Sequence, residues 1–307
     1  MFAKLKEYGR ASLSIGIFLA NTTLAGFPVT LLVLARLLPL RFWQRRCSQA
    51  LTRVAETWIT INNINLSLLQ PTRFRVEGAE ELRTDGRYLL LANHQSAMDI
   101  PLLQRALTRR IPLLRFFIKQ QLIWVPVLGL AWWALGFPFM KRSSRAQRAR
   151  RPELRGADLR AARQACERLA CGPLTMMNFV EGTRFTMAKH ARSGSPYRHL
   201  LAPRAGGAAV VVAALGEQLD AVLDVTLHYP AGVPSLLDLF CGRVPEALVK
   251  IHARPAPDPA LAQAYLDDPE RREPFVAWLG ELWAVKDDEL AELVGDLEGR
   301  ELMPRAA

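Results

Sequence analysis

Two side chains that can do acid–base chemistry, His94 and Asp99, stand five positions apart in the segment Leu89–Ile100. An apolar run at 88–91 precedes them, which is typical of a buried strand that ends in a polar turn. Across such a turn, a carboxylate at position 99 can reach back to one imidazole nitrogen. The other nitrogen is then free to take a proton from a hydroxyl. We therefore interpret His94 as a candidate general base that Asp99 orients.

A structural alternative exists for the same residues. Ser96 and Asp99 fit the spacing of a helix capping box, although Pro101 favours Asp99 itself as the N-cap because proline then falls in the first turn. In that case the pair would only begin a helix.

A second polar turn follows the apolar run 174–177, in the segment Asn178–Phe185. Arg184 supplies a guanidinium, which binds phosphate through two parallel hydrogen bonds. Backbone N–H groups near Gly182 are candidates for a cradle that holds an oxyanion or a phosphate. The structural alternative is a local ion pair between Glu181 and Arg184 that closes the turn.

The two turns together resemble the conserved blocks of the glycerolipid acyltransferases, that is, the 1-acylglycerol-3-phosphate (lysophosphatidate) acyltransferases and their relatives. Asn93, His94 and Asp99 match the first block, N-H-x4-D. The segment 179–185 matches the third, F-P-E-G-T-R-S, with Val180 in place of proline and Phe185 in place of serine. The resemblance covers roughly residues 70 to 255.

Two further segments resemble this family. The second block, G-x-x-F-I-x-R, corresponds to 136–142, with Met140 in place of isoleucine and Arg142 as its last residue. The segment 119–129 is similar to the lysocardiolipin-acyltransferase-like branch. The fourth block has no clear counterpart, and 208–215 and 225–230 are its candidates.

The resemblance implies acyl transfer from acyl-CoA or acyl carrier protein to the free hydroxyl of lysophosphatidate, giving phosphatidate. It assigns His94 and Asp99 the roles of base and orienting group, with direct attack, no acyl-enzyme, and no metal or redox cofactor. The expected phosphate-binding set is Arg142, Glu181, Gly182, Thr183 and Arg184, in which Glu181 orients Arg184 or the loop. Another lysophospholipid or glycerol 3-phosphate remains an alternative acceptor, since the blocks do not separate them.

The charge of the chain points to an anionic partner. The 307 residues carry a net charge of +11, which suits nucleic acid, an acidic membrane surface or a phosphorylated substrate. Nucleic acid is disfavoured, because the basic stretch 140–163 lacks interleaved aromatic residues. A non-enzymatic membrane protein that binds acidic lipid is the rival hypothesis. The four cysteines show no C-x-x-C spacing and favour reduced thiols over a metal site.

Residues 11–35 contain no charge, a length that can span a bilayer. Because basic residues flank both ends, their distribution selects no orientation. A single span and a hairpin in one leaflet both remain open, and a buried core helix is the alternative to membrane anchoring. We expect a membrane protein, in a bacterial inner membrane with its catalytic domain on the cytoplasmic side.

The alternation of strand and helix patterns predicts an α/β fold, a mixed sheet flanked by helices, with an N-terminal membrane-anchoring helix or helical hairpin. We divide the chain into an anchor with an amphipathic helix (1–70), an acyltransferase catalytic domain (71–255) and a C-terminal helical tail packed on that domain without a chemical role (256–307). Within the domain, 120–135 predicts either a core helix or a membrane-facing or acyl-chain-lining surface, and the polar segment 189–199 predicts a loop.

Overall fold

A mixed sheet of six strands lies at the centre of the computed structural model, which describes residues 2–140, 157–169 and 172–301. The strand order is β1-β8-β7-β2-β6-β3. All neighbouring strands run parallel except β7 and β8, which are antiparallel. The strands are β1 (Arg73–Glu77), β2 (Arg87–Ala92), β3 (Leu114–Phe116), β6 (Leu174–Phe179), β7 (Ala221–His228) and β8 (Glu246–Arg254). This sheet confirms the predicted fold class.

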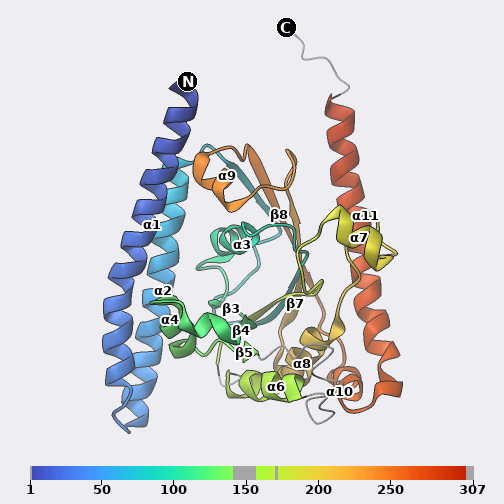
Figure 1. The fold of residues 1–307 in the computed structure, drawn as a ribbon. Coiled ribbons are helices and arrows are strands. Elements are labelled where there is room, and N and C mark those ends of the chain that lie inside the picture. Colours follow the sequence, from blue (N-terminus) through green and yellow to red (C-terminus); the bar gives the residue numbers. More distant parts are fainter. Residues whose placement is uncertain (1, 141–156, 170–171, 302–307) are drawn as a thin grey trace.

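Helices cover both faces of the sheet (Figure 1). Side chains alternate along β2, so Leu89 and Leu91 join one core cluster while Leu90 and Ala92 join the other. The first cluster includes residues of α6 (Ala157–Leu169), α8 (Ala205–Leu215), α10 (Pro259–Asp267) and α11 (Glu273–Glu301), and the second includes residues of α3 (Asp99–Leu107) and α9 (Leu236–Cys241). Because β2 is buried on both sides, its end is a rigid position for functional side chains.

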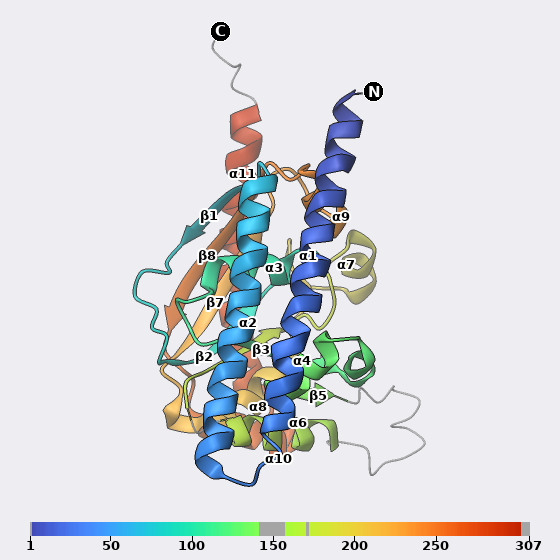
Figure 2. The same cartoon turned by 90° about the vertical axis from the view of Figure 1, so that its left-hand side faces the viewer.

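The N-terminal helices α1 (Phe2–Ala35) and α2 (Arg41–Leu69) lie side by side as an antiparallel hairpin on one flank of the molecule (Figure 2). α1 continues unbroken through Pro28 and is long and apolar enough to cross a membrane. Its polar residue Asn21 turns inward and donates to Asn62 Oδ1 (2.8 Å) and to the Trp58 carbonyl (3.0 Å) of α2. The outward face of α1 is largely apolar, with exposed Leu19, Leu24, Phe27, Leu31 and Leu34.

Two segments differ from the sequence prediction. The segment 120–135 is not one helix but a 3₁₀ turn, η1 (Gln120–Trp124), followed by α4 (Leu128–Ala134), because Pro126 and the positive φ of Val127 (62°) interrupt it. The predicted loop 189–199 begins as a short helix, α7 (Met187–Ser193), with Thr186 as its N-cap and Gly194 (φ 62°) at its end. A two-stranded ribbon of β4 (Ile118–Lys119) and β5 (Phe139–Met140) lies beside η1.

Candidate active site

His94 lies at the carboxyl end of β2, and its imidazole contacts the carboxylate of Asp99 in the first turn of α3. The distance from His94 Nδ1 to Asp99 Oδ2 is 2.8 Å. The same oxygen accepts the backbone N–H groups of Gln95 (2.7 Å) and Ser96 (2.9 Å). An oxygen that accepts two other N–H groups is an acceptor for the imidazole too, which assigns the ring proton to Nδ1.

Tyr229, directly after β7, completes the environment of Asp99. Its hydroxyl donates to Asp99 Oδ1 at 2.5 Å, and both side chains are buried. Burial and the adjacent carboxylate raise the pKa of Tyr229 well above 10, so the phenol keeps its proton. No local pattern predicted this contact, because 130 residues separate the partners.

Two contacts fix the position of the His94 ring. Asn93 donates to the Leu227 carbonyl (2.9 Å) and accepts the Leu227 N–H (2.8 Å), which ties the end of β2 to β7. Phe179, the last residue of β6, stacks on the imidazole with ring centroids 4.0 Å apart and an interplanar angle of 15°. Nε2 of His94 has no hydrogen-bond partner in the described part of the chain, and the side chain is 18% exposed. This nitrogen is free to accept a proton from a bound hydroxyl.

Glu181 lies behind His94, in the protein interior. One carboxylate oxygen accepts the His94 backbone N–H (2.8 Å), and the other accepts that of Leu201 (3.2 Å). Burial raises the pKa of Glu181 to about 7 despite these two N–H donors. No ion pair joins Glu181 to Arg184 among the described residues, so the local pair considered from the sequence is absent. Glu181 connects two loops, which fits the predicted loop-orienting role better than contact with a phosphate.

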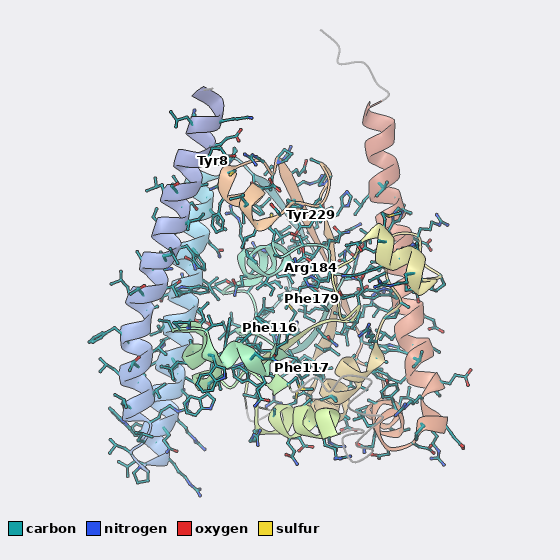
Figure 3. All side chains as sticks on the ribbon, viewed as in Figure 1. Tyr8, Phe116, Phe117, Phe179, Arg184 and Tyr229 are labelled. Carbon is teal, nitrogen blue, oxygen red and sulfur yellow. The ribbon has the colours of Figure 1, made fainter. Side chains whose placement is uncertain are left out.

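The turn after Glu181 runs beside His94. Gly182 has a φ of +69°, and its N–H donates to the Phe179 carbonyl (2.9 Å), so this N–H does not belong to the predicted cradle. The N–H of Phe185 donates to the His94 carbonyl (2.7 Å), which brings the turn next to the imidazole. Arg184 is exposed in between, and Figure 3 shows it in the same region as Phe179. Arg142, the other predicted phosphate ligand, falls outside the described residues.

Two cations that the sequence did not single out lie at this turn. The amino group of Lys189 on α7 donates to Thr183 Oγ1 (2.7 Å) and to the Arg184 carbonyl (2.8 Å). Arg204 passes its side chain over Gly182, with Cδ 3.1 Å from the place where a Cβ would stand. For Lys189, the sequence showed only that it begins a polar segment predicted to be a loop. No local pattern placed Arg204 near the site.

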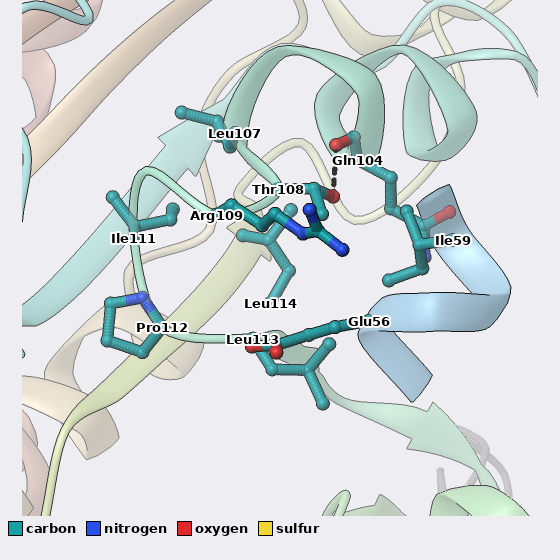
Figure 4. Close-up of a pocket in the computed structure, with 10 residues that line it drawn as sticks. All are labelled: Glu56, Ile59, Gln104, Leu107, Thr108, Arg109, Ile111, Pro112, Leu113 and Leu114. Atoms are coloured by element: carbon teal, nitrogen blue, oxygen red, sulfur yellow. Dashed lines mark hydrogen bonds between the residues drawn. The ribbon is translucent and has the colours of Figure 1, made fainter. Parts of the chain in front are cut away.

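An apolar pocket opens between the N-terminal hairpin, α4 and β3. Phe116 of β3 lines it and pairs in register with Met177 of β6, two residues before Phe179. The pocket therefore reaches β3, the neighbour of β6 in the sheet, from α1 and α2. A separate small pocket lies where α2 meets the connection from α3 to β3, with Glu56, Gln104 and Arg109 on its wall (Figure 4). It contains none of the predicted site residues.

In the described part of the chain, no cluster of three or more His, Cys, Asp or Glu side chains is arranged to hold a metal ion. The buried cysteines Cys47, Cys166 and Cys241 are free thiols.

Comparison with known proteins identifies the class that this sheet and site define. Residues 73–229, from β1 to the tyrosine beside Asp99, match the family model described as Acyltransferase, and the chain belongs to this family. It is similar to Lysocardiolipin acyltransferase 1 of Mus musculus, 27% identical over 293 residues that cover 90% of this chain and 72% of the relative.

Two other similarities are informative. The 1-acyl-sn-glycerol-3-phosphate acyltransferase gamma of Homo sapiens is 30% identical over 199 residues, 61% of this chain and 48% of the relative. The crystal structure of the 1-acyl-sn-glycerophosphate (LPA) acyltransferase PlsC from Thermotoga maritima has the same fold, with a TM-score of 0.51 at 21% identity, and the match covers 89% of this chain and 98% of that one. The chain is thus an acyltransferase of the lysophosphatidate and lysocardiolipin acyltransferase group, as the sequence blocks predicted.

Proposed function

We propose that the protein moves a fatty acyl group from acyl-CoA or acyl carrier protein to the free hydroxyl of lysophosphatidate and releases phosphatidate. One observation carries the proposal: His94 presents a free Nε2 beside the turn that bears Arg184, while Nδ1 is held by a buried Asp99. A base and an anion-binding turn lie side by side, which is the arrangement needed to deprotonate a hydroxyl on a phosphorylated acceptor.

In the proposed reaction the acceptor oxygen attacks the thioester carbonyl as His94 Nε2 takes its proton. The imidazolium that forms is stabilised by Asp99, whose carboxylate accepts hydrogen bonds from three N–H groups and from the Tyr229 hydroxyl. Collapse of the tetrahedral intermediate breaks the C–S bond, and the thiolate takes the proton back from the imidazolium. No covalent enzyme intermediate is required, and the chemistry calls for no cofactor besides the acyl donor.

In this proposal Arg184 holds the acceptor's phosphate, and Arg142 of the second sequence block joins it. Thr183 and Gly182 shape the turn, while Glu181 anchors the turn to the His94 backbone from behind. The apolar pocket beside Phe116 and Phe137 suits an acyl chain, because a fatty chain gains roughly 0.8 kcal/mol for each buried CH₂ group.

We propose a membrane location in which the hairpin of α1 and α2 embeds in the leaflet that faces the catalytic domain. The exposed leucines and Phe27 of α1 form a largely apolar face, and Asn21 turns toward α2. The exposed hydroxyls of Thr23 and Thr30 donate to carbonyls of α1 itself. A lysophospholipid could then reach the site without leaving the bilayer surface. We further propose that this membrane is a bacterial inner membrane and that the catalytic domain lies on its cytoplasmic side.

The test is acyl transfer by detergent-solubilised protein, with radiolabelled acyl-CoA or acyl carrier protein and a panel of lysophospholipids plus glycerol 3-phosphate. Transfer to lysophosphatidate should disappear in His94→Ala. It should persist in the control His252→Ala, because the His252 ring on β8 contacts Glu289 of α11. Transfer that survives in His94→Ala would exclude this mechanism. Preferential transfer to another lysophospholipid or to glycerol 3-phosphate would change the proposed identity of the acceptor but not the proposed mechanism. Lipid binding without transfer from either donor would favour the non-enzymatic hypothesis.

A further inference from the structure

Three cationic side chains converge on the turn 182–184. Arg184 belongs to the turn itself. Lys189 reaches it from α7 through its bonds to Thr183 Oγ1 (2.7 Å) and the Arg184 carbonyl (2.8 Å). These two bonds use two of the three ammonium hydrogens, so one donor of Lys189 remains for a ligand.

Arg204, the residue before α8, approaches the turn from a more distant part of the chain. Its backbone N–H donates to the Val180 carbonyl (2.7 Å), which places residue 204 directly behind the turn. Its side chain then crosses Gly182, with Nε 3.3 Å from the position of a Cβ. Glycine is required here twice, because of the positive φ and because a larger residue would push Arg204 away. The guanidinium itself is exposed and able to bind a ligand.

No carboxylate forms an ion pair with Arg184, Lys189 or Arg204 within the described ranges of the chain. The acid nearest in sequence, Glu181, points inward to the backbone of His94 and Leu201. Three like charges around one turn repel one another unless an anion compensates them, and each can form a strong charge-assisted hydrogen bond to phosphate. An anion with more than one negative charge is the ligand that fits.

We propose that Lys189 and Arg204 act with Arg184 as one binding site that selects a phosphomonoester acceptor over a phosphodiester. This inference rests on the proposed function and narrows its substrate class. A phosphomonoester carries about −1.5 to −2 charges near pH 7, whereas a diester carries a single charge. Lys189 and Arg204, which lie outside the third sequence block (179–185), bind the extra charge of the monoester.

The test compares kcat/KM for lysophosphatidate and for its methyl phosphodiester with the same acyl chain. In Arg204→Gln and in Lys189→Gln, the KM for lysophosphatidate should rise about 10-fold or more, as expected for the loss of one charge-assisted hydrogen bond. The KM for the diester should change little, so the preference for the monoester falls. Arg204→Lys should recover part of the preference for the monoester. Arg192→Gln, which removes an exposed charge on the same helix as Lys189, should leave this preference unchanged.

A binding measurement separates this inference from the catalytic proposal. Glycerol 3-phosphate should raise the unfolding temperature of the wild type and of His94→Ala, and should fail to do so in Arg204→Gln. If His94→Ala keeps both transfer and stabilisation, the catalytic proposal fails while this site stands. If the monoester preference and the stabilisation are the same in Arg204→Gln, Lys189→Gln and wild type, the site proposed here is wrong.

Discussion

The hydroxyl of Tyr229 donates to the Asp99 oxygen that His94 does not use, at 2.5 Å. Both oxygens of this buried carboxylate are therefore hydrogen-bonded, one of them three times. A carboxylate with both oxygens hydrogen-bonded in this way holds one orientation, which keeps the His94 ring in one tautomer. In the proposed mechanism, Tyr229 therefore acts through Asp99 as a positioning residue.

Replacing Tyr229 with phenylalanine should move the acid limb of the pH profile of kcat/KM to higher pH. Without the phenol, Asp99 keeps more of its negative charge for the imidazole, and the imidazolium form of His94 becomes more stable. The measurement is the pH dependence of kcat/KM in Tyr229→Phe. Tyr197→Phe, which loses a hydroxyl that donates to the Gly280 carbonyl (3.3 Å), should keep the wild-type profile. An unshifted profile in Tyr229→Phe would exclude the positioning role.

Glu181 should make the stability of the fold depend on pH. Burial raises its pKa from 4.5 to about 7, so between these values the folded chain holds a proton that the unfolded chain releases. The free energy of unfolding contributed by this group therefore falls as the pH rises from about 4.5 to 7, by up to about 3 kcal/mol. Denaturant unfolding at pH 5 and pH 7.5 should show this fall in wild type and a smaller one in Glu181→Gln. Equal slopes in the two proteins would show that Glu181 is not protonated in the folded state.

The C-terminal helix α11 should affect catalysis although it carries no candidate catalytic group. Asp287 accepts the backbone N–H groups of Arg198 (2.6 Å) and His199 (2.7 Å), and Trp283 donates to the Leu201 carbonyl (3.0 Å). Leu201 in turn donates to Glu181, which holds the His94 backbone. A continuous set of contacts thus joins α11 to the base.

We expect Asp287→Asn to lower kcat with little change in KM and to cost about 1 to 3 kcal/mol of stability, because the amide faces a backbone N–H with its own donor. Steady-state kinetics and denaturant unfolding measure the two effects. Asp288→Asn, a neighbour in α11 for which no side-chain hydrogen bond or ion pair occurs among the described residues, is the control. A loss of stability with unchanged kcat would mean that α11 supports the fold but not the position of His94.

The parts of the site that sequence analysis predicted are local ones. His94 and Asp99 are five positions apart across one strand-to-helix turn, so residue types and spacing sufficed to predict their contact. The strands β2 and β6 were likewise visible as apolar runs that end in polar turns. In each case the information lies within about ten residues of chain.

The parts that were missed depend on chain segments far apart in sequence. Local spacing suggested that Glu181 pairs with Arg184, yet its partners come from positions 94 and 201, because β2 and β6 are neighbours in the sheet. Tyr229 and Arg204 reach the site through strand order and loop packing, which no periodicity encodes. The tail was expected to pack without a chemical role, and its contacts with 198–201 became visible once the fold was known.

The packing of α2 on the domain indicates whether the N-terminal hairpin crosses the bilayer or stays in one leaflet. Its contacts with the domain run from Leu51 to Gln70, which donates to the Phe240 carbonyl (3.0 Å). At 1.5 Å per residue this contact is about 29 Å long, close to the thickness of a bilayer's hydrocarbon core. A hairpin crossing the bilayer would draw the polar domain into the hydrocarbon along that whole length. The hairpin should therefore stay in one leaflet, with both ends and the domain on the same side.

The accessibility of the turn between α1 and α2 distinguishes a hairpin in one leaflet from an α1 that crosses the membrane. A cysteine introduced at Leu38, an exposed residue of this turn, into a chain without its four native cysteines should be labelled by a membrane-impermeant thiol reagent from the side that faces the catalytic domain. Ser193→Cys, on exposed α7, marks that side. Labelling of both positions in inverted vesicles and of neither in intact spheroplasts is the expected result. Labelling of position 38 in spheroplasts alone would mean that α1 crosses the membrane, and the packing of α2 on the domain would then have to open when the protein inserts.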